Sequence, residues 1–496
     1  MYRDVMTNCG PIPVLDGESI ISVEPARFIR PAQLSNPIVE LCRLCGVDRA
    51  ADIGRYPPVA SLSTAGSDND SDHFHLFEVV FGRDALKVAS AFRHDFPELL
   101  KTTIAYLAGQ QGLPREIAPE AEQYDAREEE DGRIAHEIRD PDSARARTLT
   151  EIEGWGWPFY RSDDATVLFV VALAELAEED PATLTRMVRQ RDGQERPLHD
   201  SLMRALGWAN RKAANAEGLL ESVRPERQPG RPGLPSYAVW QDSADSAFRP
   251  DGSLTTGPVA WAELQSAYHD GLMAVARLAE NPATANFIDA AAPELRERAR
   301  LLRESVRRFL WVEAGRADGY FSFGAERVNG GLHALPVLKS NAGALLHSSL
   351  LDGDESRPLV EAHVQYAMDP RNGLVCPTGM RTCSSREARF TPRSYHNGQV
   401  WPLDNHEMAA GFRRHGFVEY ADWIDGRIVE NCRALHCYPE NLVGWDRDTP
   451  LLGDVLAITA GMDPVYGEWR NAITAPQLIQ GFTLAAYWGA SEKVRK

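Results

Sequence analysis

Residues 164–177 read DATVLFVVALAELA, a run that is apolar on more than one side when it is drawn as a helix. A helix on the surface of a globular protein has a single apolar stripe, so a helix with two apolar sides needs neighbours on both. Helix pairs that close on themselves supply such neighbours. The run therefore favours a closed arrangement of helix hairpins over a single layer.

Helical spacing of apolar residues recurs from residue 81 onward, without a convincing series of alternating strands. The predicted helices are 37–47, 84–96, 97–112, 164–177, 198–217, 258–279, 293–311, 340–351, 359–367, 403–415, 418–433 and 475–487. No fixed repeat of about 30 to 50 residues is present, which argues against an ordinary solenoid. The helices come in pairs with polar loops between them, which predicts an all-α toroid whose loops gather over one mouth.

Two stretches lie outside this pattern. Residues 1–75 are rich in Pro, Ser and Asp, and we expect an irregular N-terminal segment packed on the barrel, followed by one domain over residues 76–496. Residues 114–150 are charged and lack periodicity, so they are interpreted as a long excursion between helices. Loops of that length are usually functional or disordered.

The charge balance restricts the class of partner. Lys and Arg number 53 against 71 Asp and Glu, a formal net charge of −18. Such a surface repels phosphate backbones and anionic lipid, so we expect neither nucleic acid nor membrane as partner, whereas a neutral sugar is not repelled. Seven cysteines argue against a disulfide framework, and no signal peptide or long apolar run is found. We expect a soluble cytoplasmic protein, with its oligomeric state left open.

The segment that follows Trp240 contains three aspartates, Asp242, Asp245 and Asp251, in a loop rich in Ser, Gly and Pro. Aspartates in such a loop often cap the next helix. However, an apolar wall beside a carboxyl raises its pKa, as a general acid requires. Asp242, next to Trp240, is the candidate general acid, whereas we expect Asp245 and Asp251 to orient the loop or to bind substrate hydroxyls, with helix capping left open for these two.

Other polar clusters combine aromatic rings, which stack on the C–H faces of sugars, with charged groups that bind hydroxyls. The candidates are Arg83, Asp84, His136, Glu137, Glu263, Gln265, Arg381, Tyr395, His396, Trp401, Asp404 and Glu440. Asp84 is also a candidate helix cap, and Glu440 a candidate exposed loop acid. His396 and His406 lack the spacing of metal ligands, so we expect no metal and no cofactor.

Two carboxyls are candidates for joint chemistry. Glycoside hydrolysis uses one protonated and one ionised carboxyl, about 6.5–9.5 Å apart when a water molecule must fit between them. Asp242 and Glu440 form the candidate pair, and Glu468 is the alternative to Glu440. No GxxxxGK[ST], no GxGxxG after a strand and no GxSxG occurs, so nucleotide chemistry and serine hydrolysis lose their usual support.

These motifs resemble the amylo-α-1,6-glucosidase domain of glycogen debranching enzyme and the wider glucoamylase-like clan of six-hairpin glycosidases. FGRDAL is similar to the family's GRDSL, GRIAHEIR to GKILHEIR, and SYHNGQVWPLDN to SYHNGSVWPHDN. WQDSADS is similar to WKDSGDS, and YPENLVG resembles the loop with the second catalytic glutamate. The match runs in order from about residue 81 to residue 487.

The resemblance implies an (α/α)6 toroid and an inverting, exo-acting hydrolase of an α-glucosidic bond. On the matching positions, Asp242 is the general acid and Glu440 the general base. The resemblance also implies a sugar-binding role for Arg83, Asp84, His136, Glu137, Arg381 and His396, with Trp240, Tyr395 and Trp401 as apolar walls.

Departures from the family keep other substrates open. The family's WK before the acid is WQ here, and its EVQGY is ELQSAY. The first 75 residues show no counterpart of the family's N-terminal β-sandwich. The substrate could therefore be a small α-glycoside, such as glucosylglycerate or mannosylglycerate. A sugar epimerase or isomerase on the same toroid and an inactive carbohydrate-binding protein are the remaining alternatives.

Overall fold

The computed structural model describes residues 33–63, 78–114, 126–225, 236–314, 319–444 and 477–494, together with the strand backbones at 12–16 and 19–23. None of the helices in these ranges has the length and apolar content needed to span a membrane.

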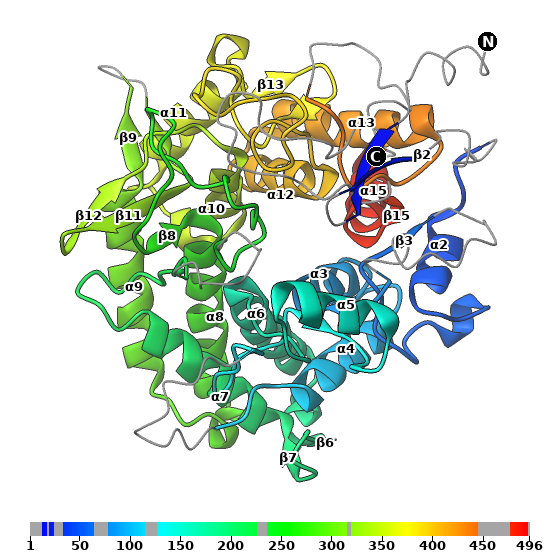
Figure 1. Cartoon of the computed structure of the whole chain (residues 1–496). Helices are drawn as coiled ribbons and strands as arrows, with labels where there is room; N and C mark the ends of the chain where they lie inside the picture. Colours follow the sequence, from blue (N-terminus) through cyan, green and yellow to red (C-terminus); the bar gives the residue numbers. More distant parts are fainter. Residues whose placement is uncertain are drawn as a thin grey trace.

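Six helices of the described chain form a closed inner ring. They are α3 (Gly82–Ala91), α6 (Asp163–Glu179), α8 (Ala262–Glu280), α10 (Gly343–His347), α12 (Pro402–Arg414) and α15 (Gly481–Val494). Each packs against the next in this order, and α15 packs back against α3. Figure 1 looks roughly along the axis of this ring.

An outer helix accompanies each inner helix. The outer helices are α2 (Pro37–Leu44), α4 (Pro97–Gly109), α7 (Leu198–Lys212), α9 (Ala292–Phe309), α11 (Arg357–Met368) and α13 (Val418–Leu435), and they surround the inner six in Figure 1. The prediction of an (α/α)6 toroid is therefore confirmed. α2 packs against α15, so residues before 76 contribute to the ring, and the division of the chain at residue 75 stays a prediction.

Burial explains why α6 is apolar on two sides. Val167, Phe169, Val170 and Leu173 are all buried although they point in different directions around the helix. One side packs on α3 and α8 within the inner ring, and another packs on the outer helix α7. A helix in this position is buried on most of its circumference, as the sequence indicates, and only the face with Glu175 and Glu178 reaches water.

Two helical predictions differ from the structure. The predicted helix 340–351 is divided into η6 (Ser340–Ala342), α10 and η7 (Ser349–Leu351). The helix α5 (Ala144–Glu153) begins within the stretch 114–150 that was interpreted as an excursion between helices. It starts after the N-cap Ser143 and ends at Gly154, which has φ 70°. The helix was not predicted because its sequence has little apolar periodicity. The remaining 3-10 turns are η2 (Ala50–Asp52), η4 (Pro181–Thr185), η5 (Ala285–Phe287) and η8 (Pro370–Asn372).

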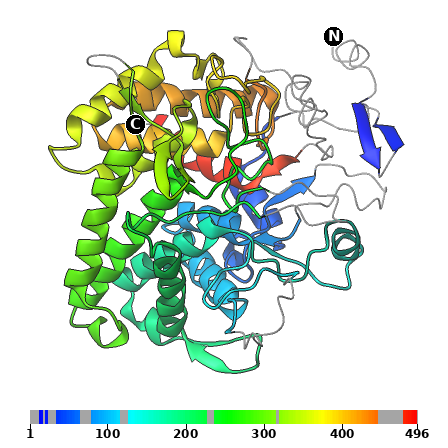
Figure 2. The ribbon, with the colours of Figure 1, turned by 60° about the vertical axis from the view of Figure 1, so that its left-hand side comes forward.

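The strands are short and pair in antiparallel fashion. They are β1 (Ile12–Asp16), β2 (Ser19–Val23), β3 (Ser61–Ser63), β4 (Val80–Phe81), β5 (Glu137–Ile138), β6 (Met187–Arg189), β7 (Glu195–Pro197), β8 (Val259–Trp261), β9 (Trp311–Glu313), β10 (Gly319–Phe321), β11 (Gly324–Val328), β12 (Gly331–Ala334), β13 (Val375–Cys376), β14 (Gly379–Met380) and β15 (Gln477–Gln480). The pairs are β1–β2, β3–β15, β4–β5, β6–β7, β9–β10 and β13–β14, and β8, β11 and β12 form a sheet of three. In Figure 2 the β1–β2 hairpin stands at the edge of the molecule, away from the helices.

Candidate active site

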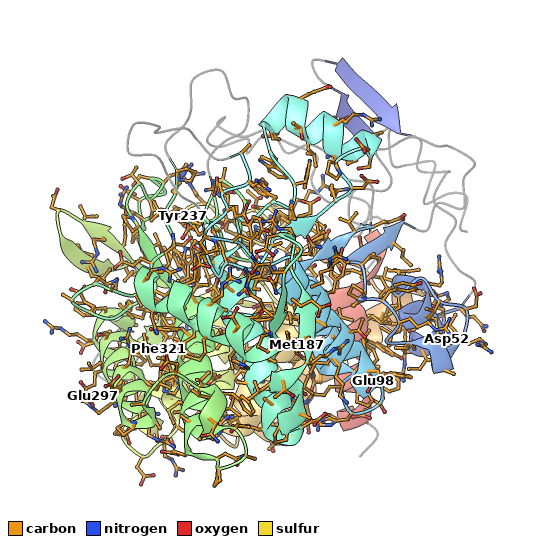
Figure 3. All side chains as sticks on the ribbon, turned by 90° about the horizontal axis from the view of Figure 1, so that it is seen from below. Asp52, Glu98, Met187, Tyr237, Glu297 and Phe321 are labelled. Atoms are coloured by element: carbon orange, nitrogen blue, oxygen red, sulfur yellow. The ribbon has the colours of Figure 1, made fainter. Side chains whose placement is uncertain are left out.

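The inner helices begin at the same end of the ring, where their first turns bring polar residues together. Short strands immediately precede three of them: β4 before α3, β8 before α8 and β15 before α15. Single backbone bridges at Lys339 and Val400 precede η6 and α12. Figure 3 labels Tyr237 at this end, within a dense group of side chains, while Glu297 lies on the periphery.

The pairing of β4 with β5 brings together two motifs that are about fifty residues apart in the sequence. Phe81 pairs with Glu137, and Gly82 N donates to His136 O at 2.9 Å. A Cβ atom at Gly82 would lie 2.2 Å from Ala135 O, so only glycine permits this approach. FGRDAL and RIAHEIR therefore meet beside the first turn of α3.

The Arg83 guanidinium lies among three carboxyls. Its Nη1 donates to Asp164 Oδ2 at 2.8 Å, and its Nε lies 3.6 Å from Asp84 Oδ2. Burial raises the pKa of Asp84 to about 7, although Arg83 opposes the shift and Asp164 and Asp242 add to it. For Asp164, Arg83 and Ser162 outweigh burial and leave the pKa below its ordinary value. Arg83 thus keeps one neighbour ionised while Asp84 titrates near neutrality.

Four buried acceptors in these first turns have no hydrogen-bond partner among the described residues. They are Asp84 Oδ2, Glu263 Oε2, Asn341 Oδ1 and Asp404 Oδ2. Burial raises the pKa of Glu263 to about 8 and that of Asp404 to about 7. Buried polar groups almost always have partners. A ligand with several hydroxyl groups would supply donors to all four acceptors.

His396 adds a hydrogen-bond donor to this site. Ser243 N donates to His396 Nδ1 at 3.2 Å, and Ser243 Oγ lies 2.9 Å from the same atom. Burial holds the pKa of His396 well below its ordinary value, so the ring is neutral and carries its proton on Nε2. His396 Nε2 is buried and has no partner among the described residues. His136, whose pKa burial lowers to about 3, has a similarly unpartnered Nδ1.

Asp242 is half-buried beside an aromatic wall. Trp240 contacts the rings of His396 and Trp401, with centroids 5.4 and 5.5 Å away, and Trp401 Nε1 donates to Tyr395 O at 2.8 Å. Burial raises the pKa of Asp242 to about 6 although the Arg83 charge opposes the shift. The Asp242 carboxyl therefore stays protonated up to a higher pH than an exposed aspartate does.

Glu440 is buried at the same end of the ring, between two backbone bridges that join Val400 to Leu442 and Tyr438 to Ile479. The Tyr395 hydroxyl donates to Glu440 Oε1 at 2.6 Å. Burial raises the pKa of Glu440 to about 7, the Tyr395 hydrogen bond opposes the shift, and the charges of Asp84 and Asp242 add to it. Glu440 and Asp242 therefore lie within electrostatic range of each other.

Residues 395–397, which we call the linking segment, connect both carboxyls. Tyr395 binds Glu440, and His396 binds Ser243, the residue after Asp242. Asn397 Nδ2 donates to Asp245 O at 3.0 Å and to Asp245 Oδ2 at 3.1 Å. Three consecutive residues thus fix the positions of the two carboxyl-bearing loops relative to each other.

Two of the predicted substrate-binding residues form hydrogen bonds with the protein backbone. Gln265 is fully buried and exchanges hydrogen bonds with the backbone of Leu220 and Trp261. Arg381 is also buried and donates to the carbonyl oxygens of Gly444, Gly373 and Val375. Both carboxamide atoms of Gln265 are thus bound to the backbone, which argues against contact with the substrate, whereas the assignment of Arg381 to the substrate stays a prediction.

Three other acids are engaged within the protein. Glu137 forms a buried ion pair with Arg139, and Asp245 accepts from Asn397. Asp251 accepts from Ser253 N at 2.9 Å and from Ser253 Oγ at 2.7 Å in an exposed turn. Asp251 thus stabilises a turn and does not cap the next helix, because α8 begins after Trp261 without a side-chain cap.

Four residues near the site were not predicted. Asp164, the first residue of the predicted helix 164–177, was not among the candidate site residues, and the sequence signal for it is the Asp-Asp pair at the start of that helix. Lys87 and Glu407 form an ion pair between α3 and α12, and Lys87 opposes the raised pKa values of Asp84 and Asp404. Lys339 lies beneath the loop of Asp242, with no sequence signal beyond its place among polar residues. Glu468, the alternative base, lies outside the described residues.

Comparisons with known proteins agree with this architecture. Residues 193–438 match the family model of the mannosylglycerate hydrolase MGH1-like glycoside hydrolase domain. This range includes Asp242 and ends two residues before Glu440. No curated protein matches the sequence.

Among solved structures, the chain is similar to the GH63 mannosylglycerate hydrolase from Thermus thermophilus in complex with Tris. The TM-score is 0.55 at 14% identity, over 92% of this chain and 98% of that chain. A bacterial glucoamylase complexed with acarbose gives a TM-score of 0.50 at 14% identity, over 93% of this chain and 55% of that chain. At such identities these structures show the fold alone. The ring of helix pairs is thus the fold of these two structures, and the family-model match over residues 193–438 indicates that the chain is a glycoside hydrolase.

Proposed function

We propose that this protein is an inverting, exo-acting hydrolase of a small α-glycoside, with Asp242 as general acid and Glu440 as general base. The observation that carries the proposal is the linking segment, which holds both carboxyls at one end of the ring. An acid and a base that act on opposite sides of one bond require a fixed separation. One shared segment is a direct way to maintain it.

The proposed reaction is a single displacement at the anomeric carbon. Asp242 transfers its proton to the glycosidic oxygen as the bond from that oxygen to the anomeric carbon breaks. Water attacks the anomeric carbon from the opposite face, and Glu440 takes the proton that the water loses. Because the pKa values of both carboxyls are raised, their roles are assigned from the sequence resemblance and from the Tyr395 hydrogen bond, which favours ionised Glu440.

The sugar would form hydrogen bonds with the unpartnered polar atoms at the start of the inner helices. Its hydroxyl groups would donate to Asp84, Glu263, Asn341 and Asp404, and its oxygens would accept from His396 Nε2. The family-model match supports mannosylglycerate as the substrate, and glucosylglycerate is the candidate of the same chemical class. The motif resemblance to amylo-α-1,6-glucosidase supports a second candidate, an α-1,6-linked glucoside.

A substrate panel followed by NMR tests the proposal. Mannosylglycerate, glucosylglycerate and isomaltose are incubated with the protein, and the anomer released is recorded before mutarotation. We expect one of the glycerates to be hydrolysed fastest, with the β-anomer released first. First release of the α-anomer would rule out inversion, and preferential hydrolysis of isomaltose would favour the second candidate.

Variants of three carboxyls test the assignment of residues. Asp242→Asn and Glu440→Gln should each lower kcat by about 10²–10⁴-fold, as expected for loss of a general acid or base. Asp251→Asn is the matched control in the same loop and should leave kcat unchanged. Glu468→Gln should weaken turnover far less than Glu440→Gln, and the reverse order would transfer the role of base to Glu468.

A further inference from the structure

The buried amine of Lys339 lies beneath residues 242–248, which we call the acid loop. Lys339 is fully enclosed, and its Nζ donates to Ser246 O at 2.8 Å and to Asn397 Oδ1 at 3.0 Å. Nζ also lies 5.7 and 5.4 Å from the ring centroids of Phe248 and Phe323. Burying an ammonium group is costly, so a lysine here requires contacts that use its charge.

Lys339 fixes the orientation of the Asn397 carboxamide. The amide oxygen faces the ammonium group of Lys339, which leaves the NH2 group to donate to Asp245 O and Asp245 Oδ2. A carboxamide turned by 180° would place its NH2 group against the ammonium and its oxygen against the Asp245 carboxylate. The charge of Lys339 therefore selects the orientation of Asn397 that holds the acid loop.

The acid loop is held at four points by side chains from outside it, one of which is the Thr255 hydroxyl that donates to Ala247 O at 3.2 Å. His396 binds Ser243, Asn397 binds Asp245, and Lys339 binds Ser246. Asp242 directly precedes the first of these points. Lys339 is the member that contacts both the acid loop and the linking segment.

We propose that Lys339 is a positioning residue for the general acid, which through Ser246 and Asn397 fixes the acid loop so that the Asp242 carboxyl faces the glycosidic oxygen. The inference rests on the proposed function, in which Asp242 protonates the leaving group. Displacement by about 1 Å of a group that must meet a reacting atom can lower the rate about 10²-fold.

Rates measured with two different leaving groups distinguish a misplaced general acid from a general loss of folded protein. An alkoxide leaves only when it is protonated, whereas fluoride leaves without a proton. Hydrolysis of a methyl α-glycoside therefore needs a well-placed Asp242, and hydrolysis of the corresponding α-glycosyl fluoride does not. Loss of folded protein, in contrast, slows both reactions by the same factor.

The experiment compares Lys339→Met with the wild-type protein on methyl α-D-glucoside and α-D-glucosyl fluoride, or on the manno pair if that is the pair hydrolysed. We expect a loss of about 10²-fold on the methyl glycoside and a much smaller loss on the fluoride. Gln265→Met is the matched control, because Gln265 is equally buried but bonds only to backbone. It should affect both substrates by the same factor.

Equal losses on the two substrates for Lys339→Met would overturn the inference. If that variant does not fold, Asn397→Ala removes the same relay and is judged by the same comparison. Asp242→Asn is measured alongside. If Asp242→Asn shows no difference between the substrates, the proposed function fails, whereas a difference there but not for Lys339→Met rejects the role of Lys339 alone.

Discussion

The hydroxyl of Tyr395 is the direct hydrogen-bonding partner of Glu440. Tyr395→Phe removes a hydrogen bond that lowers the pKa of Glu440. A base must be ionised to act, so raising its pKa moves the acidic limb of the kcat/KM profile to higher pH. We expect kcat/KM below neutral pH to fall about tenfold, as for loss of a hydrogen bond to a charged group. An unchanged acidic limb would show that Tyr395 does not influence the pKa of the base.

Glu263 provides a test of linkage between pH and stability. Burial raises its pKa in the folded protein to about 8 from an ordinary value of 4.5. The folded state therefore holds this proton more tightly, and its stability falls as the pH rises from about 4.5 to 8. Glu263→Gln removes this loss, so its free energy of unfolding should exceed that of the wild type by a few kcal/mol, on the order set by the shift, at pH 8.

Urea unfolding at pH 4.5 and pH 8 measures this difference, which should be small at the lower pH. A constant difference between the two pH values would show that Glu263 does not titrate as described.

Residue types in the sequence indicated the chemistry of the site but not the partner of each side chain. Arg381 and Gln265 are of the kinds that bind sugars, yet both bind backbone carbonyls. Lys339 and Asp164 became visible only when distant segments were brought together, since an isolated lysine and a helix-start aspartate have common structural uses. The periodicity and the motifs thus predicted the candidate residues. The contacts in the folded ring show which of these side chains bind backbone groups and which lie at the site.

At the scale of elements, close packing of α10 against α12 depends on Gly411. A Cβ atom there would lie 2.8 Å from His347 N and 2.9 Å from Leu346 Cβ. Gly411→Ala should therefore destabilise the protein by about 1–3 kcal/mol, as expected for overpacking, although alanine is the better helix former. Gly426→Ala on α13 is the control, because nothing lies within 4 Å of its Cβ position. It should stabilise the protein by up to about 1 kcal/mol, and denaturant midpoints compare the two.

The helices were predictable where burial imposes a strong pattern. α6 and α8 are buried on several sides and their sequences show it. α5 escaped prediction because its apolar pattern is weak, and α10 is short because the chain enters and leaves it through 3-10 turns. The short strands could not be predicted, since segments of two to five residues carry too little periodicity.

At the scale of the whole molecule, closure of the ring depends on α15, which packs against α3, α12 and α13. Removing residues 477–496 exposes apolar faces on all three. The resulting loss should exceed the stability of about 5–15 kcal/mol that a domain usually possesses. We expect no cooperative thermal transition and no activity for this deletion.

Removal of residues 1–32 is the matched control, because the strands β1 and β2 described there pair with each other rather than with the ring. This shorter chain should keep its thermal transition and its turnover. Cooperative unfolding after loss of residues 477–496 would contradict a closed ring.

The linking segment also constrains how this enzyme could evolve. Because Tyr395, His396 and Asn397 contact the proposed base and the loop of the proposed acid, a substitution there would alter both halves of the proposed reaction at once. New substrate preferences should therefore arise through changes outside these three residues. We expect natural and engineered relatives with new specificities to retain the Tyr-His-Asn sequence.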